Sequence, residues 1–335
     1  MPTDNSNMLK AIGDFPNQCR TALDLAKGMT VSGRIDKIAV AGMGGSAVGG
    51  DLLKTYMRDS KIPVFVIRDY SIPNYIDENT LFFAVSYSGN TEETLSAYEE
   101  AVRKKAKIVA VTSGGQLAAK AKKAIKIPSG LQPRAALGYL FFPVLGVLNN
   151  SGIVDVKGSE VEEMLGILEK TEDFRSFGER LAKKLYGKTP IIYSSNLFGP
   201  VAYRWKTQFN ENSKSPAFHH VFAELNHNEI VGYQLMNKNE WSAIFIRDKH
   251  DNDRIKLRMD ITKEIISTRV EVEEIFTRGE SLLSRIFSGI YYGDFASYYL
   301  ALANRIDPTP VNVIENMKKK LKTKPKIFPP SLSRS

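Results

Sequence analysis

Short apolar runs without polar alternation recur along the chain, and each is followed by a longer amphipathic stretch. Four of them lie in the first half, at 37–41, 64–67, 81–85 and 107–111. Three more lie in the second half, at 190–194, 242–246 and 269–275. Strands of this kind, spaced by helices, are typical of parallel sheets that are covered on both faces. The pattern therefore predicts an α/β protein with two doubly wound, flavodoxin-like units.

Apolar residues at helical spacing predict the helices around these strands. Residues 8–26 form an amphipathic helix that places Cys19 on its packing face, and 135–148 is apolar all round, as in a buried helix. Residues 156–177 read as a polar amphipathic connection between the two units. Further helices are predicted at 91–105, 198–209, 251–266, 289–303 and, with an apolar stripe, 311–321.

The chain has 335 residues, which is the length of about two domains. The restart of the strand and helix pattern suggests where they divide. We predict an N-terminal helix at 1–27, a first domain at 28–152, a second domain at 153–310, and a C-terminal helix with a basic tail at 311–335.

The net charge of +9 favours anionic partners. The densest basic run, from Lys318 to Lys326, is typical of a solvated helix face or tail, and no nucleic-acid-binding motif accompanies it. We therefore expect no nucleic acid partner. The apolar run at 135–148 is shorter than a membrane span, the N-terminus lacks a signal peptide, and Cys19 is the single cysteine. These features predict a cytoplasmic protein without a membrane partner.

Two strand-to-helix turns carry candidate chemistry. Residues 41–51 are rich in glycine, which lets a backbone approach an anion at a helix N-terminus. The spacing fits neither a dinucleotide fingerprint nor a Walker loop. The second turn, Ser86-Tyr-Ser-Gly-Asn-Thr91, offers three serine and threonine hydroxyls and a glycine before a helix, which suits a phosphate. The same turn also fits a plain helix cap, with Asn90 or Thr91 as the capping residue.

These turns resemble the signature of the sugar isomerase (SIS) domain. Three later stretches are similar to the bifunctional phosphoglucose/phosphomannose isomerases, a branch of the phosphoglucose isomerase superfamily. They are Gln132-Pro-Arg-Ala-Ala-Leu-Gly-Tyr, Asn210-Glu-Asn-Ser-Lys and Glu224-Leu-Asn-His-Asn-Glu-Ile-Val-Gly. The resemblance runs from about Lys37 to Lys320. It implies aldose–ketose isomerisation of sugar phosphates through an enediol(ate), with no cofactor and no metal.

The resemblance also implies roles for individual residues. Glu211 matches the family's catalytic base, and Arg134 matches an arginine that stabilises the enediolate. The phosphate-binding residues it implies are Gly45, Ser46, Ser86, Ser88 and Thr91.

Three further positions match family residues. His227 matches a ring-opening histidine that the superfamily supplies from the neighbouring subunit, which implies a homodimer with composite sites. Lys318 matches a C-terminal lysine that contacts the substrate, and we expect it to point inward while Lys319 and Lys320 face water. Thr309 matches a threonine that permits mannose 6-phosphate as a substrate alongside glucose 6-phosphate.

Three other hypotheses stay open at this point. A metal-dependent isomerase would use His219, His220, Glu224, His227 and Glu229, although adjacent histidines on a strand point to opposite faces. A non-catalytic sugar-phosphate sensor would not need Glu211 and His227 together. An amino-sugar phosphate isomerase is the third hypothesis.

Overall fold

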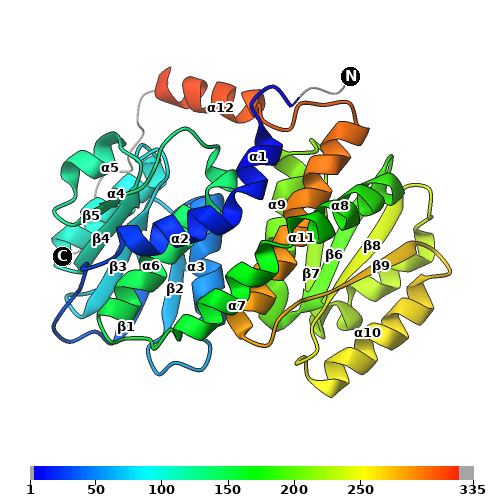
Figure 1. Cartoon of the computed structure of the whole chain (residues 1–335), viewed down its shortest axis with the longest axis horizontal. Helices are drawn as coiled ribbons and strands as arrows, with labels where there is room; N and C mark the ends of the chain where they lie inside the picture. The colour runs from blue at the N-terminus through cyan, green and yellow to red at the C-terminus, as the bar shows by residue number, and fades with distance from the viewer. Residues whose placement is uncertain (1–3, 324–335) are drawn as a thin grey trace, which may run out of the picture.

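The computed structural model describes residues 4–323 and contains two parallel sheets with helices on both faces (Figure 1). The first sheet has the order β2-β1-β3-β4-β5 and the second the order β7-β6-β8-β9. The first order is the flavodoxin-like one, so the predicted fold class is confirmed. The strands are β1 (Lys37–Ala41), β2 (Val64–Ile67), β3 (Thr80–Val85), β4 (Lys107–Thr112), β5 (Ala124–Lys126), β6 (Thr189–Ser195), β7 (Phe218–Phe222), β8 (Trp241–Arg247) and β9 (Glu271–Phe276).

The seven predicted strands are present within two residues of their expected ends, and two edge strands were not predicted. β5 is three residues long and pairs only with β4. β7 contains two histidines and is only partly buried, so it lacks the apolar run that marks a covered strand. These two edge strands escaped the pattern because one is too short and the other too polar to form a recognisable apolar run.

The helices cover both sheets and join them. Their bounds are α1 (Met8–Gly13), α2 (Phe15–Leu25), α3 (Gly45–Tyr56), α4 (Glu92–Arg103), α5 (Gly115–Lys120), α6 (Leu137–Asn150), α7 (Gly158–Leu168), α8 (Thr171–Leu185), α9 (Gly199–Glu211), α10 (Asp253–Ile266), α11 (Leu282–Ala303) and α12 (Asn312–Thr323). Four short 3₁₀ turns accompany them: η1 (Pro133–Ala135), η2 (Asn196–Phe198), η3 (Glu224–His227) and η4 (Glu229–Leu235).

Two predicted helices are each divided in the structure. The expected helix at 8–26 is two helices, because Pro16 lies in the first turn of α2 and cannot donate the hydrogen bond that a continuous helix needs. The expected single helix at 156–177 is α7 followed by α8, with a turn at Glu169 and Lys170. Both corrections concern helix boundaries, which an apolar stripe does not encode.

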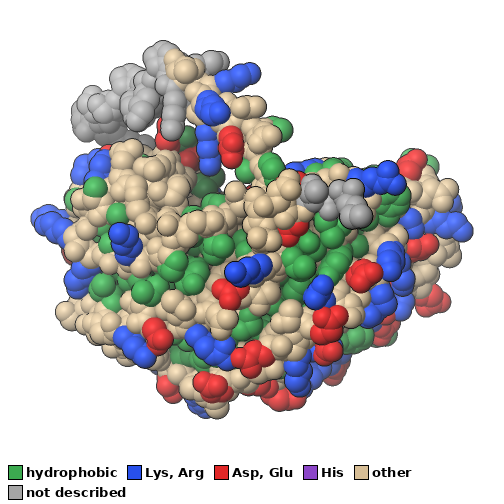
Figure 2. Space-filling model, turned by 45° about the horizontal axis from the view of Figure 1, so that its top comes forward, with side chains coloured by type: hydrophobic (Ala, Val, Ile, Leu, Met, Phe, Trp, Pro, Cys, Tyr) green, Lys and Arg blue, Asp and Glu red, His purple; other side chains and the backbone are tan. Residues whose placement is uncertain are grey.

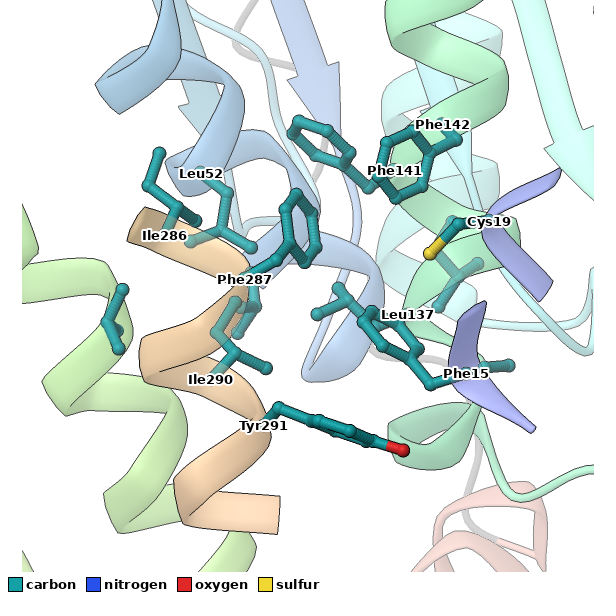
Figure 3. Close-up of a cluster of buried hydrophobic side chains, with 14 of the residues drawn as sticks. Phe15, Cys19, Leu52, Leu137, Phe141, Phe142, Ile286, Phe287, Ile290 and Tyr291 are labelled. Carbon is teal, nitrogen blue, oxygen red and sulfur yellow. The ribbon is translucent and has the colours of Figure 1, made fainter. Parts of the chain in front are cut away.

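The core that joins the two halves lies between the sheets, where α11 packs against α7, α8 and α9. Phe141 and Phe142 of α6 meet Phe287 of α11 with ring centroids 5.1 and 5.0 Å apart, and Cys19 is fully buried beside them (Figure 3). Burying each phenylalanine contributes about 1.5–3 kcal/mol. The thiol predicted on a packing face is therefore part of this core, and burial raises its pKa.

The C-terminal helix α12 differs from its prediction. Its stripe residues Met317 and Leu321 are 53% and 50% exposed, and Lys318, Lys319 and Lys320 are all exposed. The inward orientation expected for Lys318 is therefore not found in the single chain. Figure 2 shows the helix projecting from the body of the molecule. The rest of the predicted basic tail, 324–335, lies outside the described residues.

No helix within residues 4–323 is long and apolar enough to cross a membrane.

Candidate active site

The loop from Ser86 to Thr91, which follows β3 and leads into α4, forms a tightly held turn that we call the hydroxyl loop. The Ser86 and Thr91 hydroxyls are hydrogen-bonded at 2.9 Å, and the Gly89 amide donates to Ser86 Oγ at 3.1 Å. Gly89 has a φ of +67°, and a Cβ there would lie 1.8 Å from the Gly114 carbonyl oxygen. Only glycine fits this position.

The N-terminus of α4 is not closed by its own capping residue. Thr91 occupies the N-cap position, but its side chain caps no amide and is bonded to Ser86 instead. The Asn90 side chain accepts from the Gln116 amide at 3.1 Å, and Ser88 is exposed. The helix-cap interpretation of this turn is therefore wrong for the Asn90 and Thr91 side chains. The N-terminus of α4, next to the hydroxyl loop, can therefore bind an anion.

The glycine-rich turn brings α3 against the segment that carries Arg134. Gly44, with a φ of +52°, precedes the helix, and a Cβ on Gly45 would lie 3.0 Å from the Pro133 carbonyl oxygen. Ser46, in the first turn, is 4% exposed. Gly45 and Ser46 are thereby placed beside Arg134, which follows Pro133 in η1.

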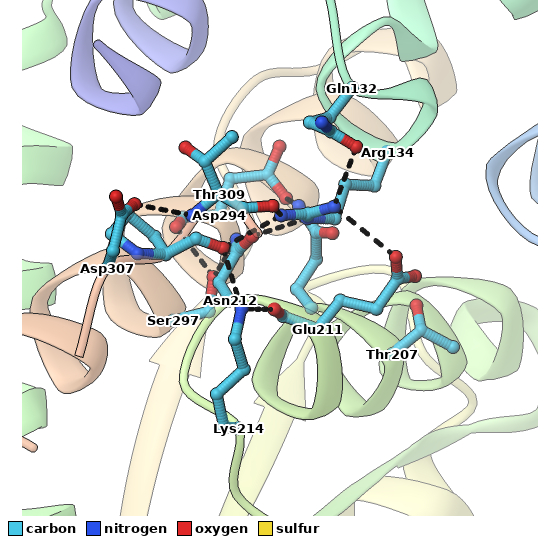
Figure 4. A network of polar contacts seen from close by, with 12 residues as sticks. Gln132, Arg134, Thr207, Glu211, Asn212, Lys214, Asp294, Ser297, Asp307 and Thr309 are labelled. Carbon is cyan, nitrogen blue, oxygen red and sulfur yellow. Dashed lines mark hydrogen bonds and ion pairs between the residues drawn. The ribbon is translucent and has the colours of Figure 1, made fainter. Parts of the chain in front are cut away.

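Arg134 is the centre of a polar network and is only 3% exposed (Figure 4). Nε donates to Asn212 Oδ1 at 2.6 Å, and Nη2 donates to the Pro308 and Thr309 carbonyls, both at 2.8 Å. Burial lowers the pKa of the guanidinium, while the nearby Glu211 carboxylate favours its charged form. An arginine held by this many fixed acceptors presents its remaining N–H groups in a defined direction.

Glu211, the last residue of α9, lies next to this arginine. Its Oε2 is 3.5 Å from Arg134 Nη1, and its side chain is 28% exposed. Apart from this long contact, the structure records no hydrogen bond to the Glu211 carboxylate within residues 4–323. Figure 4 shows the carboxylate directed toward Arg134. The pair thus combines an accessible carboxylate with a fixed positive charge, which is the arrangement needed to move a proton and stabilise an oxyanion.

A buried layer behind the pair holds it in place. Arg204 forms an ion pair with Asp294 at 2.8 Å, donates to the Arg134 carbonyl at 3.0 Å, and is 2% exposed. Asn212 Nδ2 donates to Ser297 Oγ at 2.9 Å. Because α9 and α11 share these bonds, the end of α9 and the backbone of Arg134 are fixed together.

Lys214 is a site residue that the sequence analysis did not single out. Its ammonium donates to the carbonyls of Glu211 and Pro308, the latter at 2.9 Å, and so ties the end of α9 to the segment before Thr309. Partial burial, together with the Arg134 guanidinium, lowers the pKa of Lys214 to about 8. The only sequence signal for it was its place in the stretch that resembles the family.

Thr309 lies in the same cluster. It is 8% exposed, its amide donates to Asp307 Oδ1 at 2.9 Å, and its carbonyl accepts from Arg134. The Thr309 hydroxyl is buried without a hydrogen-bond partner within residues 4–323. An unpaired buried hydroxyl is costly, so a polar partner from outside the chain is expected there.

His227 and Lys318 are not part of this cluster. His227 is exposed on η3, and no hydrogen bond or ion pair joins it to Glu211 or Arg134 in the described part of the chain. Lys318 lies on α12, also exposed. Their roles stay predictions. Within residues 4–323, no group of three or more His, Cys, Asp or Glu side chains could hold a metal ion, so this region offers no ligand set for the metal-dependent alternative.

Comparison with known proteins identifies the family. A family model described as the SIS domain matches residues 34–140, and the bacterial phospho-glucose isomerase C-terminal SIS domain matches residues 175–321. The bifunctional phosphoglucose/phosphomannose isomerase of Caldicellulosiruptor bescii is 44% identical over 94% of this chain and 98% of its own length. The chain belongs to the bifunctional phosphoglucose/phosphomannose isomerase family.

Two more distant similarities link this chain to proteins of other names. The D-glucosamine-6-phosphate 4-epimerase of Sulfolobus acidocaldarius is 31% identical over 85% of this chain and 89% of its own. The C-terminal domain of glucosamine-fructose-6-phosphate aminotransferase from Francisella tularensis shares the fold, with a TM-score of 0.70, 15% identity, and coverage of 91% of this chain and 98% of that one. The phosphoglucose/phosphomannose isomerase fold is thus shared with proteins whose names denote other reactions.

Proposed function

We propose that this protein catalyses the reversible isomerisation of glucose 6-phosphate and of mannose 6-phosphate to fructose 6-phosphate. The observation that carries the proposal is the accessible Glu211 carboxylate 3.5 Å from the fixed guanidinium of Arg134. The family membership supports the same reaction. A carboxylate and a buried cation side by side supply the base and the charge stabilisation that an enediolate intermediate requires.

Each step of the proposed reaction has a residue suited to it. Glu211 removes the proton from C2 of the aldose, or from C1 of the ketose, and returns it to the neighbouring carbon. Arg134 stabilises the negative oxygen of the enediolate while that proton is held. Because Arg134 is already bound on its other side, little reorganisation is needed as the charge develops.

The substrate phosphate is proposed to bind at the hydroxyl loop. Ser86, Ser88 and Thr91 provide hydroxyl donors at the N-terminus of α4, and Gly45 and Ser46 approach from the start of α3. Binding energy from this remote group would orient C1 and C2 at the Glu211 carboxylate.

Thr309 is proposed to contact the reacting part of the sugar. Its buried hydroxyl lacks a protein partner within the described residues, and its carbonyl is bound to Arg134. A substrate hydroxyl would satisfy it. Space for rotation about the C2–C3 bond at this position would let either face of the enediol receive the proton, which yields glucose or mannose phosphate.

His227 is proposed to open the sugar ring in the active site of a second subunit. Within one chain it is exposed, and it precedes Val231 and Leu235, which are 62% and 94% exposed. Exposed apolar side chains on one short element, here η4, are typical of a surface that another protein covers. The proposed homodimer would cover them and bring His227 to the partner's sugar.

A coupled assay tests the reaction. With fructose 6-phosphate as substrate, we expect both glucose 6-phosphate and mannose 6-phosphate to form, and we expect a chelator to leave both rates unchanged. Formation of neither aldose would contradict the proposal. Loss of activity with chelator would instead support the metal-dependent mechanism.

A Ser88→Ala variant tests the phosphate site. We expect KM for fructose 6-phosphate to rise about tenfold, because one hydrogen bond to a charged group is lost. The weak binding of unphosphorylated fructose should stay unchanged. Equal effects on both sugars would show that Ser88 does not contact the phosphate.

A further inference from the structure

Apart from the catalytic cluster, the structure contains a cavity, which we call the second cavity, at the far end of α9 from Glu211. It has a volume of about 580 Å³ and is open to solvent on one side. Its walls are the carboxyl ends of β6 and β7, the loop after β8, the starts of α9 and α10, and the second half of α3 with the turn that follows it. Lys54, Thr55, Arg58, Ser195, Asp251 and Asn252 are among the residues that line it.

The topology of the two sheets makes this cavity the counterpart of the catalytic site. In the order β7-β6-β8, the loops that follow β6 and β8 occupy the places that the loops after β1 and β3 hold in the order β2-β1-β3. Ligands of open parallel sheets bind at this point, where neighbouring strands lead off in opposite directions. The catalytic loops use the switch point of the first sheet, and the second cavity lies at the switch point of the second.

The helices α3 and α9 both run between the two sites, and their chain directions are opposite. α3 begins against Pro133, next to Arg134, and its second half lines the second cavity. α9 begins at the second cavity, with Gly199, and ends at Glu211. The two helices are in contact. Each site is therefore formed by the start of one of these helices and the end of the other.

One wall of the second cavity carries a buried hydroxyl without a hydrogen-bond partner in the described residues, next to a buried carboxyl. Ser195 is 5% exposed, and its hydroxyl, which faces the Asp251 carboxyl, makes no hydrogen bond within 3.5 Å in the described residues. Asp251 is 7% exposed and accepts from the Asp248 amide at 3.2 Å. Burial raises the pKa of this carboxyl above its usual range. A buried hydroxyl next to a carboxyl is suited to binding the hydroxyl groups of a ligand.

The opposite wall carries positive charge. Lys54, in the last turn of α3, and Arg58, in the turn that follows the helix, are both exposed, and no ion pair of Lys54 is present among residues 4–323. Asp51, on the same wall, is neutralised by an ion pair with Arg68. Arg58 contacts only Asp59, at 3.4 Å, on its own turn. Two cations that line the same wall of a cavity can bind a phosphate together.

We propose that this cavity is a second, non-catalytic binding site for a phosphorylated polyol. The hydroxyls of the ligand bind to Ser195 and Asp251, and its phosphate binds to Lys54 and Arg58. The phosphate is assigned to the α3 wall because Lys54 and Arg58 lie there, whereas the loop that corresponds to the hydroxyl loop carries the Asp251 carboxyl. The cavity has the size of a small-molecule site. Since α3 and α9 connect the two sites, occupancy of one can act on the other.

Calorimetric titration of the full protein with glucitol 6-phosphate tests the proposal. This probe has no carbonyl group and is not isomerised. We expect two binding events per chain in the wild type and one in the Lys54→Ala/Arg58→Ala variant, with kcat/KM for fructose 6-phosphate unchanged. Both side chains are exposed, so the variant should fold. Lys61→Ala, which removes an exposed lysine that does not line the cavity, should keep both events.

The outcomes separate this proposal from the catalytic one. One binding event in the wild type, or two in the double variant, would overturn it. Inorganic phosphate that binds as tightly as glucitol 6-phosphate at the second site would also overturn it, because Ser195 and Asp251 would then contribute nothing. Ser88→Ala should weaken only the binding of glucitol 6-phosphate at the catalytic site. An inactive wild type that still shows two events would disprove the catalytic proposal and leave this one intact.

Discussion

At the scale of single residues, the site depends on one carboxylate and one buried cation. The cation is held by several hydrogen bonds, whereas the carboxylate has a single long contact. Arg134 is held by backbone carbonyls and Asn212, whereas the Glu211 carboxylate has only its 3.5 Å contact with Arg134 within the described chain. Glu211→Gln keeps the shape and removes the base. We expect kcat to fall by several orders of magnitude with substrate affinity nearly intact, measured by steady-state kinetics and by binding of glucitol 6-phosphate. Retention of more than about a tenth of kcat would move the base to another residue.

Lys214 gives the site a predicted pH dependence. Its pKa is about 8 in the folded chain, against an ordinary value of 10.5, so its charged form is disfavoured by folding. Below pH 8 the lysine is charged in both the folded and the unfolded chain, so the free energy lost by burying its charge is fully present. Between pH 8 and 10.5 the unfolded chain binds more protons, so stability rises with pH. Relative to Lys214→Gln, the wild type should therefore gain stability, by less than about 1 kcal/mol, between pH 7 and 10 in urea denaturation. A constant difference would contradict this.

At the scale of elements, the strand-to-helix turns decide whether the site exists. The hydroxyl loop depends on Gly89, where a Cβ would overlap the Gly114 carbonyl oxygen. Gly89→Ala should destabilise the protein by about 2 kcal/mol or more and abolish phosphate binding, because the loop must move. Gly166→Ala is the matched control, since Gly166 lies inside α7 with open space around it. That change should be neutral or stabilise by up to about 1 kcal/mol in thermal unfolding. Equal behaviour of the two variants would show that the turn is not constrained.

At the scale of the whole molecule, the single chain assembles only part of the proposed machinery. Glu211, Arg134 and Thr309 meet in one cluster, whereas His227 is exposed on η3. If a second subunit supplies His227, Glu211→Gln and His227→Ala should complement each other when mixed under conditions of subunit exchange. A heterodimer then carries both lesions in one site and none in the other, so a statistical mixture should recover roughly a quarter of wild-type activity.

The control for this experiment is a mixture of Glu211→Gln with Arg134→Gln. Both lesions affect groups of the same chain, so every site of a heterodimer would remain defective and no activity should return. If exchange is demonstrated by mass spectrometry and the His227 mixture also stays inactive, His227 acts within its own chain or has no catalytic role.

The sequence by itself determined the strand pattern, the parallel sheets and the two loops that end in helix N-termini. These features are local: covered strands need continuous apolar runs, and turns near anions need glycine and hydroxyl residues within a few positions. The resemblance to a known family then indicated Glu211, Arg134 and Thr309, which chemistry alone could not have selected from the other charged and polar residues of the chain.

Only the tertiary structure decided what those residues contact. Arg134 meets Glu211 and Thr309 across 77 and 175 positions of sequence, and no local pattern encodes contacts of that range. The same is true of Lys214, which the fold brings to Pro308, and of the cavity beside Ser195, which needs α3 of one half and β6 of the other. The exposed position of Lys318 is also a tertiary result. An apolar stripe states which face of a helix can be covered, but the surrounding chain decides whether anything covers it.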